Sequence, residues 1–346
     1  MGRMIILALS LALALQGCGP AREQVLLGVT GVAAPDVWFQ AEAAIALPRA
    51  LRDRPKILAL SGGGPDGAFG AGYLTARAEA GCSAPDIVTG VSIGALIATL
   101  VFASQEYALR SLFADGGFAL TSPSVNPLRA IATGTVSDGE AYRKLVAQTM
   151  DRNLIALVAA EHRKGRRLYV ATTDLDAMRM TAWDMGAIAN LPGTGAIALF
   201  HDVIIASASI PGVFPVVALP NGDGSARLHV DGGVTGQVFV PVLPPTAKRP
   251  QVRIIFNNGL SGDPPISRLE ALPTVQRGLS TLIRAQSRQQ VELARIRAKV
   301  AGGQVDAVSI PPDAPVARLQ DFSARAMAAT FELGRQIGQP PAGECP

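Results

Sequence analysis

The sequence predicts an α/β fold in which a mostly parallel central sheet is covered by helices on both faces. Two observations lead to this prediction. Short apolar runs of strand length alternate with helical segments along most of the chain, as in doubly covered parallel sheets. In addition, the motif Gly90-Val91-Ser92-Ile93-Gly94 stands directly between a predicted strand and a predicted helix. Because the composition does not change over residues 51–340, we expect this stretch to form a single domain.

The individual elements follow from the apolar pattern and from the Gly and Pro residues between them. We expect strands at residues 57–60, 87–89, 168–173, about 180–183, 227–230, 252–256 and 304–310. We expect helices at residues 93 to about 102, about 267–299 and about 321–335. Residues 104–165 have helical character with Pro and Gly interruptions, which is typical of an insertion or lid. This insertion is therefore a candidate cover for the functional site.

Composition and charge exclude several classes of protein. The chain has 346 residues, of which 49% are hydrophobic and 17% are charged, so it can form a core and is not intrinsically disordered. Three Cys residues are too few for a disulfide scaffold of this length. The net charge is +4, and basic residues cluster only at 163–167, where no aromatic residues interleave. We interpret that cluster as a solvated turn and expect no nucleic-acid partner.

The first residues have the features of a secretory signal peptide, which we place at residues 1–17. Arg3 precedes an uncharged apolar run that is too short to span a bilayer comfortably. The run leads into Leu15-Gln16-Gly17-Cys18, which resembles the bacterial lipobox, although Gln16 replaces the small or aliphatic residue usual at its position. We therefore expect a lipidated Cys18 and a tether over residues 18–50. The alternative is an ordinary cleaved signal followed by an incidental Cys.

The lipobox resemblance places the mature protein at the bacterial cell envelope. Gly19 follows Cys18, where Asp would signal retention in the inner membrane. We therefore expect the periplasmic face of the outer membrane, with the membrane reached through the N-terminal lipid anchor. In that oxidising compartment the two remaining thiols, Cys82 and Cys345, could pair in a disulfide.

The motif Gly90–Gly94 has the form G-x-S-x-G, the nucleophile elbow, in the strand-to-helix context that supports it. A serine in so sharp a turn has a strained backbone, and flanking glycines avoid collisions with neighbouring elements. The helix that follows directs its N-terminal dipole and free amides toward the hydroxyl, where negative charge develops. Ser92 is therefore the candidate nucleophile, and the alternative is a packing turn made of small residues.

A second motif, rich in glycine, occupies residues 61–72 directly after a predicted strand. Consecutive glycines at 62–64 let backbone amides converge on one point, as an oxyanion hole requires. A dinucleotide site would also fit the G-x-G-x-x-G at residues 62–67. Its ribose-binding acid, however, belongs at the end of the second strand, and Asp86 lies at the start of that strand. A P-loop is excluded, because Gly-Lys-Ser/Thr does not occur.

A third motif, His229-Val230-Asp231-Gly232-Gly233, takes a predicted strand into a turn. An Asp at the carboxyl edge of a sheet, followed by glycines, can face the same cleft as the serine of the elbow. Asp231 is therefore the candidate partner of Ser92. The alternative is an Asx turn, in which the carboxylate bonds its own backbone.

Four blocks, taken in order, resemble the patatin-like phospholipase family. They are Gly62-Gly63-Gly64, Gly90–Gly94, Ala206–Phe214 and Asp231-Gly232-Gly233. The match runs from about Lys56 to Gly233, and the predicted helix at 321–335 is similar to the family's closing helix. The resemblance implies the three-layer patatin fold, with helices on both sides of the sheet.

The resemblance also implies a chemistry. It implies a Ser–Asp dyad with Ser92 as nucleophile and Asp231 as base, and an oxyanion hole from the amides of Gly62, Gly63 and Gly64. The implied reaction releases fatty acid from membrane lipids or lysolipids, with no cofactor and no metal. One residue departs from the family pattern, because Asp66 stands where an Arg or Lys is frequent. Asp66 cannot bind a phosphate group as an Arg or Lys could, so the choice between phospholipids and neutral esters stays open.

Two further alternatives remain open from the sequence. His229 shares a strand face with Asp231 and is an easier general base near neutral pH than an Asp, whose ordinary pKa is about 3.9. We interpret His229 as a packed strand residue, with a Ser-His-Asp triad as the alternative. The second alternative is a catalytically silent lipoprotein that only binds lipid. The presence of Ser92, Asp231 and the glycine-rich turn together favours the enzyme.

Overall fold

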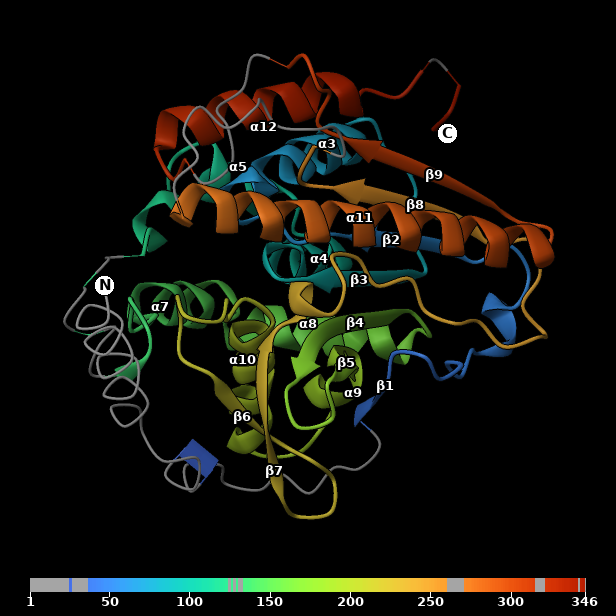
Figure 1. Cartoon of the computed structure of the whole chain (residues 1–346). Coiled ribbons are helices and arrows are strands. Elements are labelled where there is room, and N and C mark those ends of the chain that lie inside the picture. The colour runs from blue at the N-terminus through green and yellow to red at the C-terminus, as the bar shows by residue number, and fades with distance from the viewer. Residues whose placement is uncertain are drawn as a thin grey trace.

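Five parallel strands form the centre of a nine-stranded sheet (Figure 1). In order across the sheet they are β4 (Arg167–Asp174), β3 (Ile87–Val91), β2 (Lys56–Leu60), β8 (Gln251–Phe256) and β9 (Gln304–Ser309). The structure, a computed structural model, describes residues 25–26, 37–123, 126, 129, 133–259, 271–314, 321–341 and 343–345. The predicted α/β fold with a parallel core is confirmed.

Antiparallel strands extend the sheet beyond β4. The strand β5 (Arg179–Asp184) pairs with β4, and the short β1 (Trp38–Gln40) pairs with β5. The strand β7 (Ala226–Asp231) pairs with the carboxyl end of β4 and with β6 (Val217–Pro220). The sheet is therefore mixed, and the β6–β7 hairpin brings Asp231 to the carboxyl end of the parallel strands.

Helices cover both faces of this sheet (Figure 1). They are α3 (Gly67–Glu79), α4 (Ile93–Phe102), α5 (Tyr107–Phe113), α7 (Glu140–Thr149), α8 (Arg152–Arg163), α9 (Met185–Ala189), α10 (Thr194–Ser207), α11 (Ala271–Val300) and α12 (Ala324–Gly338). Short 3-10 helices are η3 (Arg49–Leu51), η4 (Gly64–Asp66), η5 (Phe118–Thr121) and η6 (Gly232–Val234).

Alternation along the central strands produces two separate hydrophobic cores. Leu58 and Leu60 of β2 point into one core, and Ile57 and Ala59 point into the other, because successive strand side chains face opposite sides. The first core is covered by most of the helices, including α3, α4, α8, α10 and α12. The second core is covered by α11 and by extended chain around residues 45–47 and 238–247. The two faces are thus closed in different ways.

Side-chain caps set several helix starts. Asp151 accepts a hydrogen bond from the Leu154 amide at 2.8 Å and caps α8. Ser323 accepts from the Ala326 amide at 3.2 Å, so the last helix begins after it, three residues later than predicted. Local polar residues therefore determine where these helices begin, which the spacing of apolar residues alone does not define.

The folded domain begins earlier than the sequence predicts. Val37, Ile45 and Leu47 are buried, and Trp38 packs against Trp183 of β5. The predicted tether over residues 18–50 is therefore wrong for residues 37–50. The sequence did not reveal this because β1 has only three residues, too few to show an alternating pattern. The predicted signal peptide at residues 1–17 and the predicted lipidation site Cys18 lie outside the described residues. Within the described part of the chain, no helix is long and apolar enough to cross a membrane.

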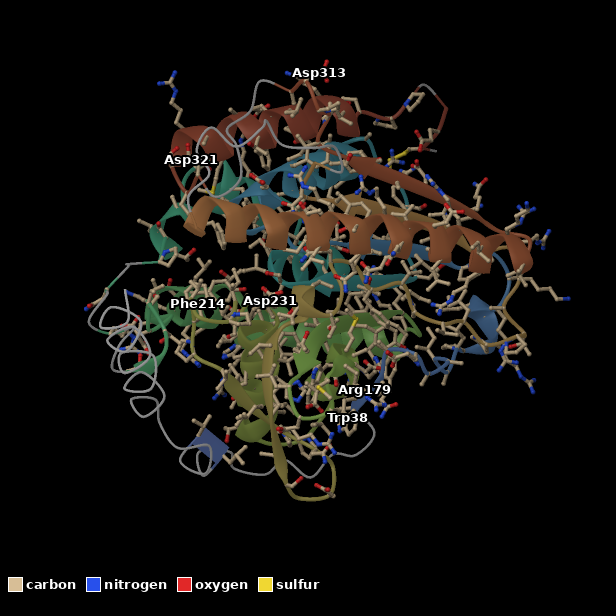
Figure 2. All side chains as sticks on the ribbon, viewed as in Figure 1. Trp38, Arg179, Phe214, Asp231, Asp313 and Asp321 are labelled. Carbon is tan, nitrogen blue, oxygen red and sulfur yellow. A yellow bond between two sulfur atoms is a disulfide. The ribbon has the colours of Figure 1, made fainter. Side chains whose placement is uncertain are left out.

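Part of the predicted insertion over residues 104–165 packs next to the loop that follows α10. The amides of Val136 and Ser137 donate to the carbonyls of Gly212 and Val213, at 3.1 and 3.0 Å. Figure 2 shows Phe214 of this loop on the same side of the molecule as Asp231. The later part of the insertion, α8, instead packs into the first core. Within the described part of the insertion, the segment at residues 136–137, just before α7, is therefore the part bonded to that loop.

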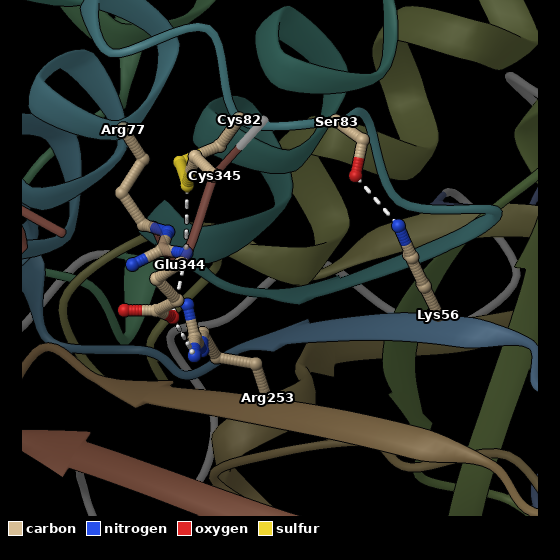
Figure 3. Close-up of a disulfide and its surroundings, with 7 residues drawn as sticks. All are labelled: Lys56, Arg77, Cys82, Ser83, Arg253, Glu344 and Cys345. Carbon is tan, nitrogen blue, oxygen red and sulfur yellow. Dashed lines mark hydrogen bonds and ion pairs between the residues drawn. A yellow bond between two sulfur atoms is a disulfide. The ribbon is translucent and has the colours of Figure 1, made fainter. Parts of the chain in front are cut away.

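A disulfide joins Cys82 and Cys345, which are 263 residues apart, where the C-terminal segment meets the loop between α3 and β3 (Figure 3). Glu344 lies beside it and accepts from Arg77 at 2.9 Å and from Arg253 at 3.0 Å. The C-terminal segment is therefore attached at the amino ends of the parallel strands by a covalent bond and by two ion pairs.

Candidate active site

Ser92 lies in the sharp turn between β3 and α4 with a left-handed backbone, φ 55° and ψ −127°. A non-glycine residue holds this strained conformation only where its surroundings fix it. Here the Ser92 amide donates to the Ser207 hydroxyl at 2.9 Å, and Ser207 donates to the Ala171 carbonyl at 2.7 Å. Ser207, from the end of α10, therefore ties the turn to β4.

The glycines of the elbow motif permit close packing around this turn. A Cβ atom at Gly94 would approach the Ser61 and Leu60 carbonyl oxygens to 2.5 and 2.6 Å. A Cβ atom at Gly90 would collide with the backbone of α4. Both positions therefore require glycine so that α4 can start directly against β2 and β3.

Asp231 holds the Ser92 hydroxyl. The Ser92 Oγ donates to Asp231 Oδ2 at 2.7 Å, and the Gly233 amide donates to Asp231 Oδ1 at 2.7 Å. The second bond is the Asx turn that was the alternative to a functional role. The two interpretations are compatible, because one oxygen forms the turn and the other faces the serine. Both residues are buried, with 7% of Ser92 and 6% of Asp231 exposed.

Burial sets the protonation behaviour of this carboxyl group. Removal from water raises the pKa of Asp231 to about 6, while the Ser92 hydroxyl and the Gly233 amide act in the opposite direction. The carboxyl group is therefore a stronger proton acceptor than an ordinary Asp and is still mostly ionised near neutral pH. The backbone is fixed as well, since the Asp231 amide donates to the Ser209 carbonyl at 2.9 Å.

The glycine-rich turn lies directly beside the serine, but its three amides are not equivalent. A Cβ atom at Gly62 would lie 3.2 Å from the Ser92 Cβ, which shows how closely the turn approaches. The Gly62 amide donates to the Gln237 carbonyl at 3.1 Å, so it is already used. Among the described residues, the amides of Gly63 and Gly64 have no hydrogen-bond acceptor. Of the three glycines predicted as donors, Gly62 therefore has its amide occupied in this conformation, whereas within the described structure the amides of Gly63 and Gly64 are free to donate.

Asn257, at the end of β8, anchors this turn. Its Nδ2 donates to the Ser61 carbonyl at 2.7 Å, and its amide donates to the Ser61 hydroxyl at 2.9 Å. Its Oδ1 accepts from the Gly70 amide at 3.1 Å. Asn257 is completely buried, so these bonds fix both sides of the turn. No local sequence pattern indicates this role, because the partners lie far apart along the chain.

Tyr142 of α7 is a further buried group that sequence patterns did not indicate. Its hydroxyl has no hydrogen-bond partner within the described part of the chain. Burial, with the Asp231 carboxylate adding to it, raises the pKa of Tyr142, so the phenol stays protonated and lies within the electrostatic reach of the site. An unpaired buried hydroxyl is uncommon, so Tyr142 stands out among the buried polar residues near the site.

His229 is a packed strand residue. Its Nδ1 shares a 2.9 Å hydrogen bond with the Thr172 hydroxyl, which also accepts from Trp183 Nε1, and the imidazole packs edge-on against Trp183. Burial lowers the pKa of His229 to about 4, so the ring is neutral at physiological pH. Ser92 bonds Asp231 instead. The geometry thus supports the packed interpretation over the Ser-His-Asp triad.

The other predicted features have simple structural positions. His201 of α10 bonds the Met150 carbonyl at 2.7 Å, and His162 of α8 lies 3.4 Å from Asp184. In the basic segment 163–167, Arg166 is mostly buried, packs over Phe102 and pairs with Glu161 at 2.8 Å. Among the described residues no His, Cys, Asp or Glu cluster could hold a metal ion. Asp66 is 8% exposed, at the start of α3.

A strained strand-to-helix turn is where serine hydrolases on α/β folds carry their nucleophile, and in this chain the hydroxyl in that position is bonded directly to a buried carboxyl group. Comparison with known families is more specific. The model of the family described as patatin-like phospholipase matches residues 58–244, and the chain belongs to this family. Membership supports a lipid hydrolase in general.

Other comparisons are distant. Among solved structures, VipD from Legionella pneumophila is similar, with 13% sequence identity over 86% of this chain and 70% of that chain. The TM-score of 0.38 is too low for an inference from that likeness. No curated protein matches the chain.

Proposed function

We propose that this protein is a serine acyl-ester hydrolase that releases fatty acid from membrane lipids or lysolipids through a Ser92–Asp231 dyad. The observation that carries the proposal is the 2.7 Å hydrogen bond between the Ser92 hydroxyl and a buried carboxylate whose pKa is raised to about 6. Nucleophile, base and orienting contact are then already in place before substrate arrives.

In the first step Ser92 Oγ attacks the ester carbonyl carbon, and its proton passes to Asp231 Oδ2. The Gly233 amide holds the other carboxylate oxygen, so the base keeps its orientation while its charge changes. The protonated Asp231 then donates the proton to the departing alcohol oxygen as the ester bond breaks. The products of this half are an alcohol or lysolipid and an acyl-enzyme on Ser92.

The negative charge on the carbonyl oxygen needs donors that are not already bonded. The Gly63 and Gly64 amides meet this condition, and a Cβ atom at Gly64 would meet no other atom within 4 Å, so the space beside it is open. A donor of this kind contributes about 10²–10³ in rate. In the second step a water loses its proton to Asp231 and attacks the acyl carbon, and Asp231 returns that proton to Ser92 Oγ as the acyl–oxygen bond breaks and the fatty acid leaves.

Asp66 bears on which head group the substrate carries. Asp66, where the family often has a cation, is buried and acidic, so it supplies no positive charge for a phosphate. We therefore propose that neutral acyl esters are hydrolysed at least as well as phospholipids and lysophospholipids, which both carry the phosphate. Rates on matched vesicles of diacylglycerol, lysolipid and phospholipid test this order.

We also propose that the enzyme is a lipoprotein of the bacterial cell envelope, acylated at Cys18 after removal of residues 1–17. The supporting observation is the sequence Leu15-Gln16-Gly17-Cys18 after a short apolar run. Incorporation of labelled palmitate that is lost in Cys18→Ser supports this proposal. Equal incorporation in both would place the acyl group elsewhere, and no incorporation would favour an ordinary cleaved signal.

The decisive experiment is labelling of the full chain with a fluorophosphonate, which reacts with activated serines. Wild type and the exposed-serine control Ser225→Ala should label, whereas Ser92→Ala should not. Asp231→Asn should lose about 10³ or more in labelling rate, and His229→Ala should stay within about tenfold of wild type. Folded wild-type protein that never labels would instead indicate the catalytically silent, lipid-binding lipoprotein. Complete loss in His229→Ala would indicate a triad.

A further inference from the structure

The helix α11 presents an unusual outward face. Its residues Ser287, Val291, Ala294 and Ala298 are buried at the three- and four-residue spacing of one helix side, and Val291 and Ala294 belong to the second core. On the opposite side, large apolar residues are exposed, and we call them the outer stripe: Leu282 (69% exposed), Leu293 (45%), Ile296 (54%) and Val300 (85%). A surface helix normally places polar residues there, so the outer stripe is an unusual amount of exposed apolar surface for such a helix.

Positive charge flanks the outer stripe. Arg288, Arg295 and Lys299 lie seven and four residues apart, so they line one flank, and Arg297 lies on the other. The one exposed acid on this part of the helix, Glu292, pairs with Arg295 at 3.7 Å. Arg288, Arg297 and Lys299 form no ion pair with an acid of the described chain. The outward face therefore combines apolar side chains with an excess of cations.

The same helix is hydrogen-bonded to the loop at residues 232–238, which directly follows Asp231. Gln286 Nε2 donates to the Thr235 carbonyl at 2.5 Å, and Gln290 Oε1 accepts from the Val238 amide at 3.2 Å. Thr235 follows η6, the turn that begins directly after Asp231, and Figure 2 shows Asp231 just below the α11 ribbon. Val234 of that turn is 50% exposed, so exposed apolar surface occurs on this loop as well as on the helix.

We propose that α11 is an interfacial helix that binds the protein to an anionic lipid surface. In the bound state the outer stripe inserts at the boundary between head groups and acyl chains, and the flanking cations contact lipid phosphates. An amphipathic helix with a basic flank is the element that binds such surfaces. Lipid fits better than a second copy of the chain, because two copies would bring the unpaired cations of both helices together. The proposal rests on the proposed function for its purpose, which is to bring membrane-held ester to the Ser92 side.

The test measures vesicle binding of the full chain by flotation, with every variant in a Cys18→Ser background so that the N-terminus is the same throughout. Vesicles are phosphatidylcholine alone or with about 30% phosphatidylglycerol. The charge variant is Arg288→Gln/Arg297→Gln/Lys299→Gln, and its matched control changes exposed cations elsewhere, Lys144→Gln/Arg152→Gln/Arg325→Gln. The apolar variant is Ile296→Gln/Val300→Gln, matched by Leu157→Gln/Met178→Gln. Circular dichroism confirms that each variant is folded.

We expect wild type and both controls to bind the anionic vesicles more tightly than the neutral ones. The charge variant should lose about tenfold or more in affinity for anionic vesicles, and about 0.5 M salt should remove the preference. The apolar variant should bind both compositions more weakly. Ser92→Ala should bind like wild type, which separates this proposal from the proposed catalysis.

Two results would overturn the proposal. One is equal binding of wild type, both α11 variants and their controls, which would show that the helix does not meet lipid. The other is a dimer by light scattering that Ile296→Gln/Val300→Gln separates while vesicle binding stays unchanged, which would make this face a contact between copies.

Discussion

The two ends of the parallel strands are built in opposite ways. At the carboxyl ends, Ser92 has a strained backbone and the Asp231 carboxyl is buried at a cost in solvation. At the amino ends, the Cys82–Cys345 disulfide and the ion pairs of Glu344 hold the C-terminal segment in place. The fold thus concentrates a strained backbone and a buried carboxyl group at the edge that holds Ser92 and Asp231, and it places the cross-links at the opposite edge.

The largest expected contrast comes from Asp231→Asn. The raised pKa of Asp231 means that the folded state disfavours the carboxylate relative to the unfolded chain. Replacing it by a neutral amide of the same shape should therefore stabilise the protein at pH 7, on the order of 1–3 kcal/mol, while hydrolysis falls about 10³-fold or more. Urea unfolding and kcat/KM on the same preparation measure both. A variant that is inactive and also less stable would contradict this account of the carboxyl ends.

The pH dependence of kcat/KM tests the raised pKa of Asp231 directly. Because the reaction needs the Asp231 carboxylate, kcat/KM should fall about tenfold per pH unit below about 6 and level off above it. The contribution of Asp231 to the free energy of unfolding has the opposite pH dependence. Its folded pKa is raised, so its contribution is complete below an ordinary Asp pKa and is lost as pH rises through about 6. A plateau that reaches down to pH 4 would show that the base has an ordinary pKa.

At the amino ends, removal of the disulfide should affect stability without affecting the chemistry. The variant Cys82→Ser/Cys345→Ser should lose about 2–4 kcal/mol of unfolding free energy and keep its kcat/KM at temperatures where it is folded. Wild type treated with reductant is the matched control and should behave like the double variant. A loss of activity in folded, reduced protein would mean that the two ends are coupled.

The smallest effect is expected from Glu344→Gln. The Arg253 and Arg77 guanidinium groups hold the pKa of Glu344 below its usual range, so its contribution is present near neutral pH and is lost on acidification. The carboxylate is partly exposed, and the change should lower stability by about 1 kcal/mol or less. Glu42→Gln, at an exposed residue, is the control. Equal stability of the two variants in thermal unfolding would leave the disulfide as the sole attachment of this corner.

The sequence predicted those features that depend on local pattern. The central strands are continuous apolar runs, and the elbow around Ser92 needs glycines at fixed spacing, so both are visible in a few residues. The strands β1 and β6 escaped prediction because three or four residues carry no period, and distant partners decide their pairing. The start of the domain at Val37 was missed for the same reason.

Within the site, residue types were predictable and their hydrogen bonds were not. The pairing of Ser92 with Asp231 follows from where their strands end. The supporting bonds from Ser207 and Asn257, and the use of the Gly62 amide by the Gln237 carbonyl, depend on contacts between segments far apart in sequence. No local pattern encodes such contacts, so the sequence could not show that the Gly62 amide is already bonded in this conformation.

The disulfide also changes the covalent topology of the chain. Residues 82–345 form a closed ring, and Ser92 and Asp231 both belong to it. A single proteolytic cut within the ring leaves both residues on one covalent molecule, whose pieces separate only after the sulfur–sulfur bond is reduced. A nicked protein would therefore run as one species on a non-reducing gel, and Ser92 and Asp231 would remain tethered to each other.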